Sequence, residues 1–91
     1  MSNQAESLKA LGNECFAKGK IDAAIEAYSE AICLDPRNPI YHTNRAMAYR
    51  KKEAWDQVVR DCSAAIVIDS VSIKAHYFLG AAMVEQAAAP H

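Results

Sequence analysis

The segment PIYHTNRAMAYRK, residues 39–51, decides the fold, because the rest of the chain repeats its pattern on both sides. Asn38 is a candidate N-cap, and Pro39 suits the first turn of a helix, where a missing N–H breaks no helical hydrogen bond. Asn44, Met47 and Lys51 are spaced i, i+3 and i+7, so they share one face of the expected helix. The segment is basic and contains no acid, and we expect this face to form the floor of a binding groove.

The repeat becomes visible when the sequence is displaced by 34 residues, which aligns residues 5–38 with 39–72 and then with 73–91. The first two blocks then match at Lys18/Lys52, Asp22/Asp56, Ser29/Ser63, Ala31/Ala65, Ile32/Ile66 and Asp35/Asp69. We therefore expect a single domain over residues 1–91, with repeats at 5–38 and 39–72 and a partial third repeat at 73–91.

Each block reads as two helices, and the chain as all-α. Five helices are expected, over residues 4–18, 22–34, 39–52, 55–68 and 73–88. The first should bury one stripe made of Leu8, Leu11, Gly12 and Cys15. Gly12, Ala46 and Gly80 occupy equivalent positions, where a small side chain lets two helices approach closely.

Composition excludes several classes of protein. The 91 residues are 52% hydrophobic with a net charge of −1, which excludes disorder and gives no bulk attraction to nucleic acid. No apolar run reaches membrane-spanning length, so we expect no membrane association and a cytoplasmic protein, with the nucleus as a second location. The cysteines Cys15, Cys33 and Cys62 are odd in number and widely spaced, which fits a reducing compartment.

Charge is divided between alternate helices. The first helices of the pairs carry seven basic and three acidic residues, whereas the second helices carry seven acidic and one basic residue. This division predicts one basic wall and one acidic wall. We expect Arg45, Arg50 and Lys52 to be solubilising rather than to contact a ligand, and Asp56 and Asp61 to lie on the acidic wall.

No enzymatic chemistry is indicated. His42 and His76 occupy the same repeat position, and two histidines packed at helix interfaces are favoured over a metal-binding pair. The sequence has no zinc signature, no glycine-rich phosphate loop and no cysteine–histidine nucleophile. We therefore expect neither catalytic activity nor a cofactor or metal.

The pattern resembles the tetratricopeptide repeat (TPR), in which the first helix carries a large apolar residue, Leu, Gly or Ala, and Tyr. The second helix carries Ala, Tyr or Phe, and Ala, and is followed by Pro. The first block supplies Leu8, Leu11, Gly12, Cys15, Ala24, Tyr28, Ala31 and Pro36, and the second block is a looser match. The resemblance implies a right-handed solenoid of antiparallel helix pairs, with two full repeats and the first helix of a third. It also implies that the first helices line a concave surface.

A further resemblance is to co-chaperone TPR domains that hold acidic C-terminal peptides in a carboxylate clamp. Lys9 and Asn13 match the first-helix motif KxxxN, and Asn44 and Lys74 match the clamp residues of the third and fifth helices. The run KAHYFLG, residues 74–80, has Phe78 where the clamp arginine often falls, and in this it is most similar to chaperone-binding U-box ubiquitin ligases.

This resemblance implies that the partners are the C-terminal EEVD-type peptides of seventy- and ninety-class heat-shock chaperones. It further implies that a longer protein containing this domain would link these chaperones to ubiquitination. The residues expected to bind peptide are Lys9, Asn13, Phe16, Ile40, Asn44, Met47, Lys51, Lys74, Tyr77 and Phe78. Lysine and asparagine both donate hydrogen bonds to carboxylates, and the apolar members would hold a side chain upstream.

An alternative is a scaffold for another partner, or self-association through the last helix. No helix follows it in this sequence, so its apolar side chains Ile73, Leu79, Met83 and Val84 should stay exposed. Because TPR arrays normally end on a covering helix, we expect residues 1–91 to be a fragment of a longer protein.

Overall fold

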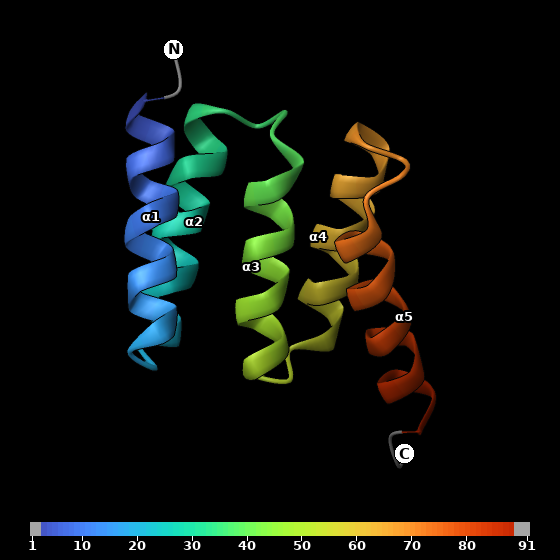
Figure 1. The fold of residues 1–91 in the computed structure, drawn as a ribbon. Helices are drawn as coiled ribbons and strands as arrows, with labels where there is room; N and C mark the ends of the chain where they lie inside the picture. Colours follow the sequence, from blue (N-terminus) through green and yellow to red (C-terminus); the bar gives the residue numbers. More distant parts are fainter. Residues whose placement is uncertain (1–2, 89–91) are drawn as a thin grey trace.

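The computed structural model describes residues 3–88 and contains five helices within that range (Figure 1). They are α1 (Asn3–Ala17), α2 (Ile21–Leu34), α3 (Pro39–Lys51), α4 (Trp55–Ile68) and α5 (Ile73–Ala88). The all-α prediction is confirmed, and each predicted helix end lies within one residue of the observed one.

The helix ends follow from local chemistry. The side chain of Asn38 accepts a hydrogen bond from the N–H of Ile40 at 3.0 Å, and Ser72 accepts one from Ala75 at 3.2 Å. These side chains satisfy N–H groups that lack a partner in the first turn. After α1 and α3 the chain turns through positive φ angles, 78° at Gly19 and 57° at Glu53, which are equivalent repeat positions. Glycine adopts this conformation without cost, whereas Glu53 does so against its preference.

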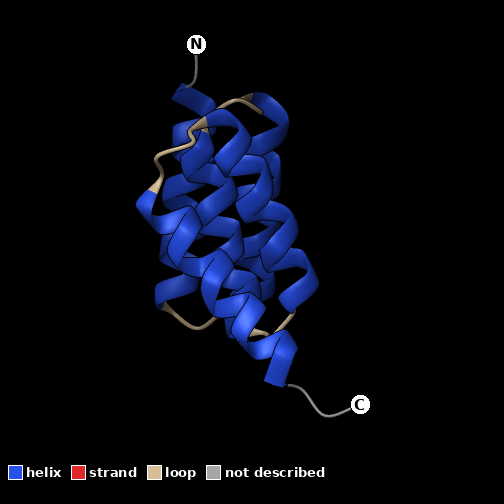
Figure 2. Ribbon diagram, turned by 90° about the vertical axis from the view of Figure 1, so that its right-hand side faces the viewer, coloured by secondary structure: helices blue, strands red, loops and turns tan. Residues whose placement is uncertain are grey.

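The helices pack in sequence order as antiparallel pairs. The pairs α1–α2 and α3–α4 stand side by side, and α5 packs against α4 and, to a smaller extent, α3. As a result α1, α3 and α5 run in one direction while α2 and α4 run back (Figure 1). The edge-on view in Figure 2 shows the helices stacked over one another, with only short loops at the two ends.

The interior consists of three small clusters, each built around an aromatic ring. Tyr41 packs with Ala5 and Ala31, Tyr28 with Ala24 and Ala48, and Phe78 in the cluster between α3, α4 and α5. Because alanine covers so little volume, the helices come close and each ring fills the space that remains.

The closest of these approaches is between Gly12 on α1 and Tyr28 on α2. A Cβ atom at Gly12 would lie 2.4 Å from Cε1 of Tyr28, so any side chain there would have to displace the ring. This confirms the predicted role of Gly12. Leu11 was also predicted to be buried, and this is wrong, since it is 48% exposed. The fully buried residues of α1 are Ala5 and Gly12, so the covered strip of the helix is narrower than predicted.

Arg45 and Asp61 also differ from expectation. Arg45 donates two hydrogen bonds to Asp61, Nε–Oδ2 at 2.8 Å and Nη2–Oδ1 at 2.6 Å, and a third to Ser29 at 3.0 Å. The Asp61 side chain is only 3% exposed. Arg45 is therefore not a solubilising residue and Asp61 does not lie on an acidic outer wall. Their bidentate pair ties α3 to α4, and Ser29 adds α2.

The outer face of α5 carries exposed apolar side chains, as predicted for Ile73, Met83 and Val84. The prediction is wrong for Leu79, which is partly buried against the Phe78 cluster. A close helix approach was also predicted at Gly80, and this is wrong within residues 3–88: a Cβ atom there would have no neighbour within 4 Å, because no described helix packs against that side of α5. Within residues 3–88, no helix combines the length and apolar character needed to cross a lipid bilayer.

Gly12→Ala is expected to destabilise the fold by about 1–3 kcal/mol, because the added methyl group must displace the fully buried ring of Tyr28. Gly80→Ala is the matched control, since the same change in open space should stabilise the helix by about 0.5–1 kcal/mol. Urea unfolding followed by circular dichroism measures both. Equal effects at the two glycines would contradict the packing described for Tyr28.

Candidate functional site

A polar cluster on α1 and α3 is organised around Asn13. Its Oδ1 atom accepts a hydrogen bond from the hydroxyl of Tyr28 at 2.5 Å and one from Nδ2 of Asn44 at 3.4 Å. Asn44 is only 6% exposed, whereas Asn13 is exposed. Because both contacts use the oxygen of Asn13, its amide N–H groups remain available to a ligand.

Lys9 lies one turn before Asn13 on the same face of α1 and already has an anionic partner. Its Nζ atom is 3.0 Å from Oε1 of Glu6, and the other oxygen of Glu6 accepts a hydrogen bond from the hydroxyl of Tyr41. The Tyr41 hydroxyl and the Lys9 ammonium lower the pKa of Glu6, in that order of importance. Burial of Tyr41 and its bond to Glu6 raise the pKa of that phenol to about 12. A ligand carboxylate would have to share Lys9 with Glu6.

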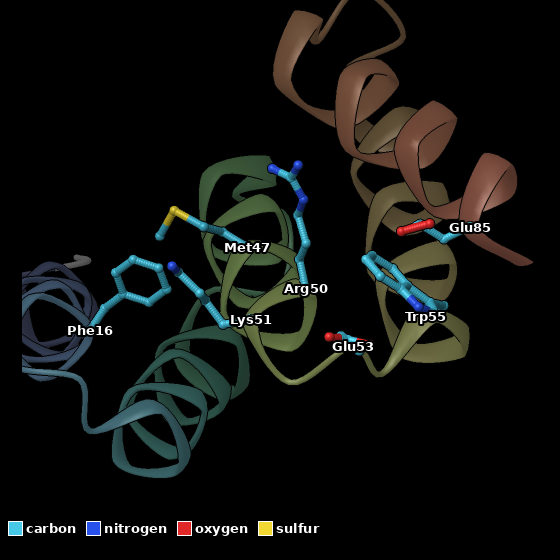
Figure 3. A pocket seen from close by; sticks show the side chains of 7 residues that line it. All are labelled: Phe16, Met47, Arg50, Lys51, Glu53, Trp55 and Glu85. Carbon is cyan, nitrogen blue, oxygen red and sulfur yellow. The ribbon is translucent and has the colours of Figure 1, made fainter.

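A cavity of about 450 Å³ opens toward the C-terminal ends of α1, α3 and α5 (Figure 3). Its lining residues are Phe16, Met47, Arg50, Lys51, Glu53, Trp55 and Glu85. Figure 3 shows that Phe16, Met47 and Lys51 face one another on one side, while Trp55 and Glu85 lie on the other. The cavity can therefore offer apolar surface and positive charge on one side and a carboxylate on the other.

Arg50 lies between this cavity and an adjoining one that Tyr77 helps to line. Its guanidinium carbon is 5.6 Å from the centre of the Tyr77 ring and 5.7 Å from that of Phe78. The two rings meet edge to face at 5.4 Å. These distances are those of cation–π contacts, so the aromatic pair fixes the guanidinium in place.

The residues predicted to form the site do not all come together. Asn13 and Asn44 are in contact, and Phe16, Met47 and Lys51 share the cavity. Three other predicted residues, Ile40, Lys74 and Tyr77, are exposed, and of these only Tyr77 lines a described cavity. Phe78 is 7% exposed and belongs to the core cluster with Ala46 and Val58, so little of it can reach a ligand directly.

The predicted site did not include several residues that lie there. Arg50 was expected to be solubilising, whereas it lines the cavity. It follows Phe16 by 34 residues, so the repeat that places Phe16 in the groove also places Arg50 there. Glu6 precedes Lys9 by three residues, a spacing at which opposite charges meet on a helix. Trp55, Glu53 and Glu85 gave no comparable signal, because they reach the cavity through the turn after α3 and the end of α5.

The two histidines have equivalent structural roles. Nε2 of His42 lies 3.1 Å from the carbonyl oxygen of Pro36, and Nε2 of His76 lies 2.9 Å from that of Ser70. Each ring therefore bonds the loop that enters its own helix. His42 is buried, as expected for a histidine packed at a helix interface, whereas His76 is exposed, so that prediction is wrong for His76. Among the described residues, no group of three or more His, Cys, Asp and Glu side chains could hold a metal ion.

Comparison with known proteins agrees with the repeat pattern. A family model described as a TPR repeat matches residues 12–53. The Arabidopsis thaliana protein named E3 ubiquitin-protein ligase CHIP is 48% identical over 85 residues, which are 93% of this chain and 31% of that protein. Small glutamine-rich tetratricopeptide repeat-containing protein 2 of Saccharomyces cerevisiae is 40% identical over 83 residues, which are 91% of this chain and 24% of that protein. The chain thus spans less than a third of these curated relatives.

Solved structures are similar over nearly the whole chain. The second TPR of Spaghetti (RPAP3), bound to the HSP90 peptide SRMEEVD, has a TM-score of 0.92 and 37% identity, and the match covers 94% of this chain and 80% of that one. The second TPR domain of human RPAP3, in complex with the HSP70 peptide SGPTIEEVD, has a TM-score of 0.88 and 38% identity, with coverages of 92% and 70%. At 37% and 38% sequence identity, both matches indicate common ancestry as well as a shared fold.

Tyr41→Phe is expected to raise the pKa of Glu6 toward the ordinary glutamate value, because it removes the contact that lowers that pKa most. Since the folded-state pKa is lowered, the contribution of Glu6 to stability is present at neutral pH and is lost as the pH falls through that value. Titration of the glutamate side-chain carbons by NMR measures the shift. Tyr77→Phe, on α5, is the control and should leave Glu6 unchanged.

Proposed function

The chain belongs to the tetratricopeptide repeat family, and we propose that it is a co-chaperone adaptor domain that binds the acidic C-terminal peptide of heat-shock chaperones. The peptide is of the EEVD type, and its terminal residue is held by a carboxylate clamp. The clamp residues are Lys9, Asn13, Asn44 and Lys74.

The observation that carries this proposal is the orientation of the Asn13 side-chain amide. Tyr28 and Asn44 both donate to its oxygen, so the amide is turned with its N–H groups outward. Lys9 stands one turn away on the same helix and supplies the charge. A terminal aspartate offers a side-chain and a main-chain carboxylate, which suits a neutral donor beside a cation. Capture of a C-terminal carboxylate is a recurring mode of peptide recognition.

The proposed contacts fit a moderate affinity. A hydrogen bond to a charged group contributes roughly 1.5–3 kcal/mol. Two lysines, two asparagines and apolar contacts with Phe16 and Met47 would then reach low-micromolar affinity, about −8 kcal/mol. Ordering a flexible peptide opposes tighter binding.

Three relatives supply the biological setting for the proposal. The two solved TPR domains are bound to HSP90 and HSP70 peptides ending in EEVD, and the name of the Arabidopsis relative is that of a ubiquitin ligase. The chain would accordingly couple cytoplasmic chaperones to ubiquitination within a longer protein. The domain itself would bind the peptide and would not catalyse a reaction, since the solved structures that match it are peptide-bound TPR domains.

A second candidate is association with another protein or with a second copy through α5. The observation in its favour is the exposure of Ile73, Met83 and Val84 on one helix. Sedimentation showing only monomer at high concentration would count against self-association.

Titration with the peptide SRMEEVD tests the leading proposal. We expect low-micromolar binding that weakens at high salt, because the charges at the site are screened. The same peptide with an amidated C-terminus should bind much more weakly. Absence of binding, or equal binding of the amide, would refute the clamp.

Asn44→Ala is expected to weaken binding of SRMEEVD by at least about 1 kcal/mol, roughly fivefold in Kd, because it removes an amide donor and releases Asn13. Gln57→Ala on α4 removes an exposed amide from the second-helix layer and should have no effect. Calorimetry gives the affinities, and circular dichroism confirms that both variants are folded. Unchanged affinity in a folded Asn44→Ala protein would contradict the assignment of Asn44.

A further inference from the structure

Arg50 is a cation that has no anionic partner among residues 3–88. The ion pairs found within residues 3–88 engage four other cations, namely Lys9, Lys18, Arg45 and Lys52. Arg50 instead lies over the rings of Tyr77 and Phe78 at 5.6 and 5.7 Å. A cation–π contact does not use up N–H donors in hydrogen bonds, and the guanidinium carries five of them.

The direction of the Arg50 side chain separates it from the acids of the same cavity. Glu53 and Glu85 both line that cavity, yet neither is within ion-pair distance of the guanidinium. Figure 3 shows the Arg50 side chain extending away from Glu53. Glu85 lies on the other side of the cavity, beside Trp55. The guanidinium therefore lies against the aromatic pair and not against these carboxylates, and Arg50 is exposed where it lines the two cavities.

Helix and peptide geometry set which peptide residue Arg50 can reach. Arg50 follows Asn44 by six residues on α3, which corresponds to roughly 9 Å along the helix axis. An extended peptide advances about 3.3 Å per residue, so the third residue before its end lies roughly 10 Å from the terminal carboxylate. The cavity of Phe16 and Met47 lies on this same side of Asn44, so the peptide has room to continue there.

We propose that Arg50, positioned by Tyr77 and Phe78, is a specificity-determining residue that pairs with an acidic side chain three residues before the C-terminus of the bound peptide. This inference rests on the proposed function, and it adds a subsite outside the clamp. In an EEVD peptide the residue concerned is the first glutamate. A planar guanidinium held by two rings loses little side-chain freedom on pairing, which favours a measurable contribution from a groove-exposed ion pair.

Phe78 acquires a defined role in this arrangement. Although it is mostly buried in the core cluster, its ring centre lies 5.7 Å from the guanidinium carbon of Arg50. Tyr77 is exposed, and its ring centre lies 5.6 Å from the same carbon. These two aromatics are positioning residues for Arg50 and are not required to contact the peptide themselves.

The test is a double-mutant cycle between the chain and its peptide. SRMEEVD, SRMQEVD and SRMEQVD are titrated into the parent chain and into Arg50→Ala by calorimetry. We expect Arg50→Ala to weaken SRMEEVD and SRMEQVD about two- to fivefold, as for a favourable exposed ion pair, and to leave SRMQEVD unchanged. Arg60→Ala, an exposed arginine on α4, is the charge-matched control and should weaken none of the three.

A second variant tests the positioning by the aromatic pair. Tyr77→Leu keeps an apolar side chain but removes one ring from Arg50, so it should produce a smaller loss for SRMEEVD and again none for SRMQEVD. Lys51→Ala tests whether the neighbouring lysine, rather than Arg50, recognises the glutamate. We expect this variant to change the affinities for SRMEEVD and SRMQEVD by the same factor. Melting curves establish that all variants are folded.

The outcomes separate this inference from the proposed function. Carboxylate-dependent binding that Arg50→Ala leaves unchanged, or weakens equally for SRMEEVD and SRMQEVD, would overturn the role of Arg50 and leave the clamp standing. Selectivity for SRMEEVD that is lost in Lys51→Ala instead would also overturn it. A parent chain that does not bind SRMEEVD, or binds its amide equally well, would overturn both proposals.

Discussion

The contact of Tyr28 with Gly12 connects the packing of the helices to the candidate site. The ring is fully buried and occupies the space that a side chain at position 12 would take. Its hydroxyl then emerges beside α1 and donates to Asn13 at 2.5 Å. A shift of α1 against α2 would move the hydroxyl away from Asn13, so the orientation of an exposed amide depends on how closely two helices approach. Burial raises the pKa of Tyr28, which keeps the phenol protonated as a donor.

The pair Arg45–Asp61 shows why a count of charges along helices misjudges a repeat protein. Both residues contribute to the apparent division into basic and acidic walls, yet they neutralise each other between α3 and α4. A buried carboxylate without its guanidinium would be strongly unfavourable, so the pair fixes the register of the two helices. The positive charge left on the groove side comes instead from residues with different surroundings, namely Lys9 beside Glu6, Arg50 over two rings, and Lys51 in the cavity.

Much of the fold could be predicted because its determinants are local. The helix ends were predictable from Asn38, Ser72, Gly19 and the 34-residue repeat, since caps and turns involve residues close in sequence. Within the candidate site, Asn13 and Asn44 were named by the resemblance to clamp motifs and not by the repeat, since they are 31 residues apart, and only the structure shows their contact. The exposure of Leu11 did not follow, because periodicity marks a face of a helix and does not say how wide a strip the neighbouring helix covers.

The sequence by itself determined that this protein consists of stacked helix pairs, because the 34-residue repeat and the spacing of apolar residues along each helix set which side chains share a face. The lysines and asparagines of the candidate clamp were named by the resemblance of their motifs to those of co-chaperone TPR domains. Only the tertiary structure decided which charges remain free for a ligand. It placed Arg45 on Asp61, Lys9 on Glu6, and Arg50 on Tyr77 and Phe78. Partners from different helices compete for each cation within a few ångströms, and that competition depends on distances between helices that no single stretch of sequence encodes.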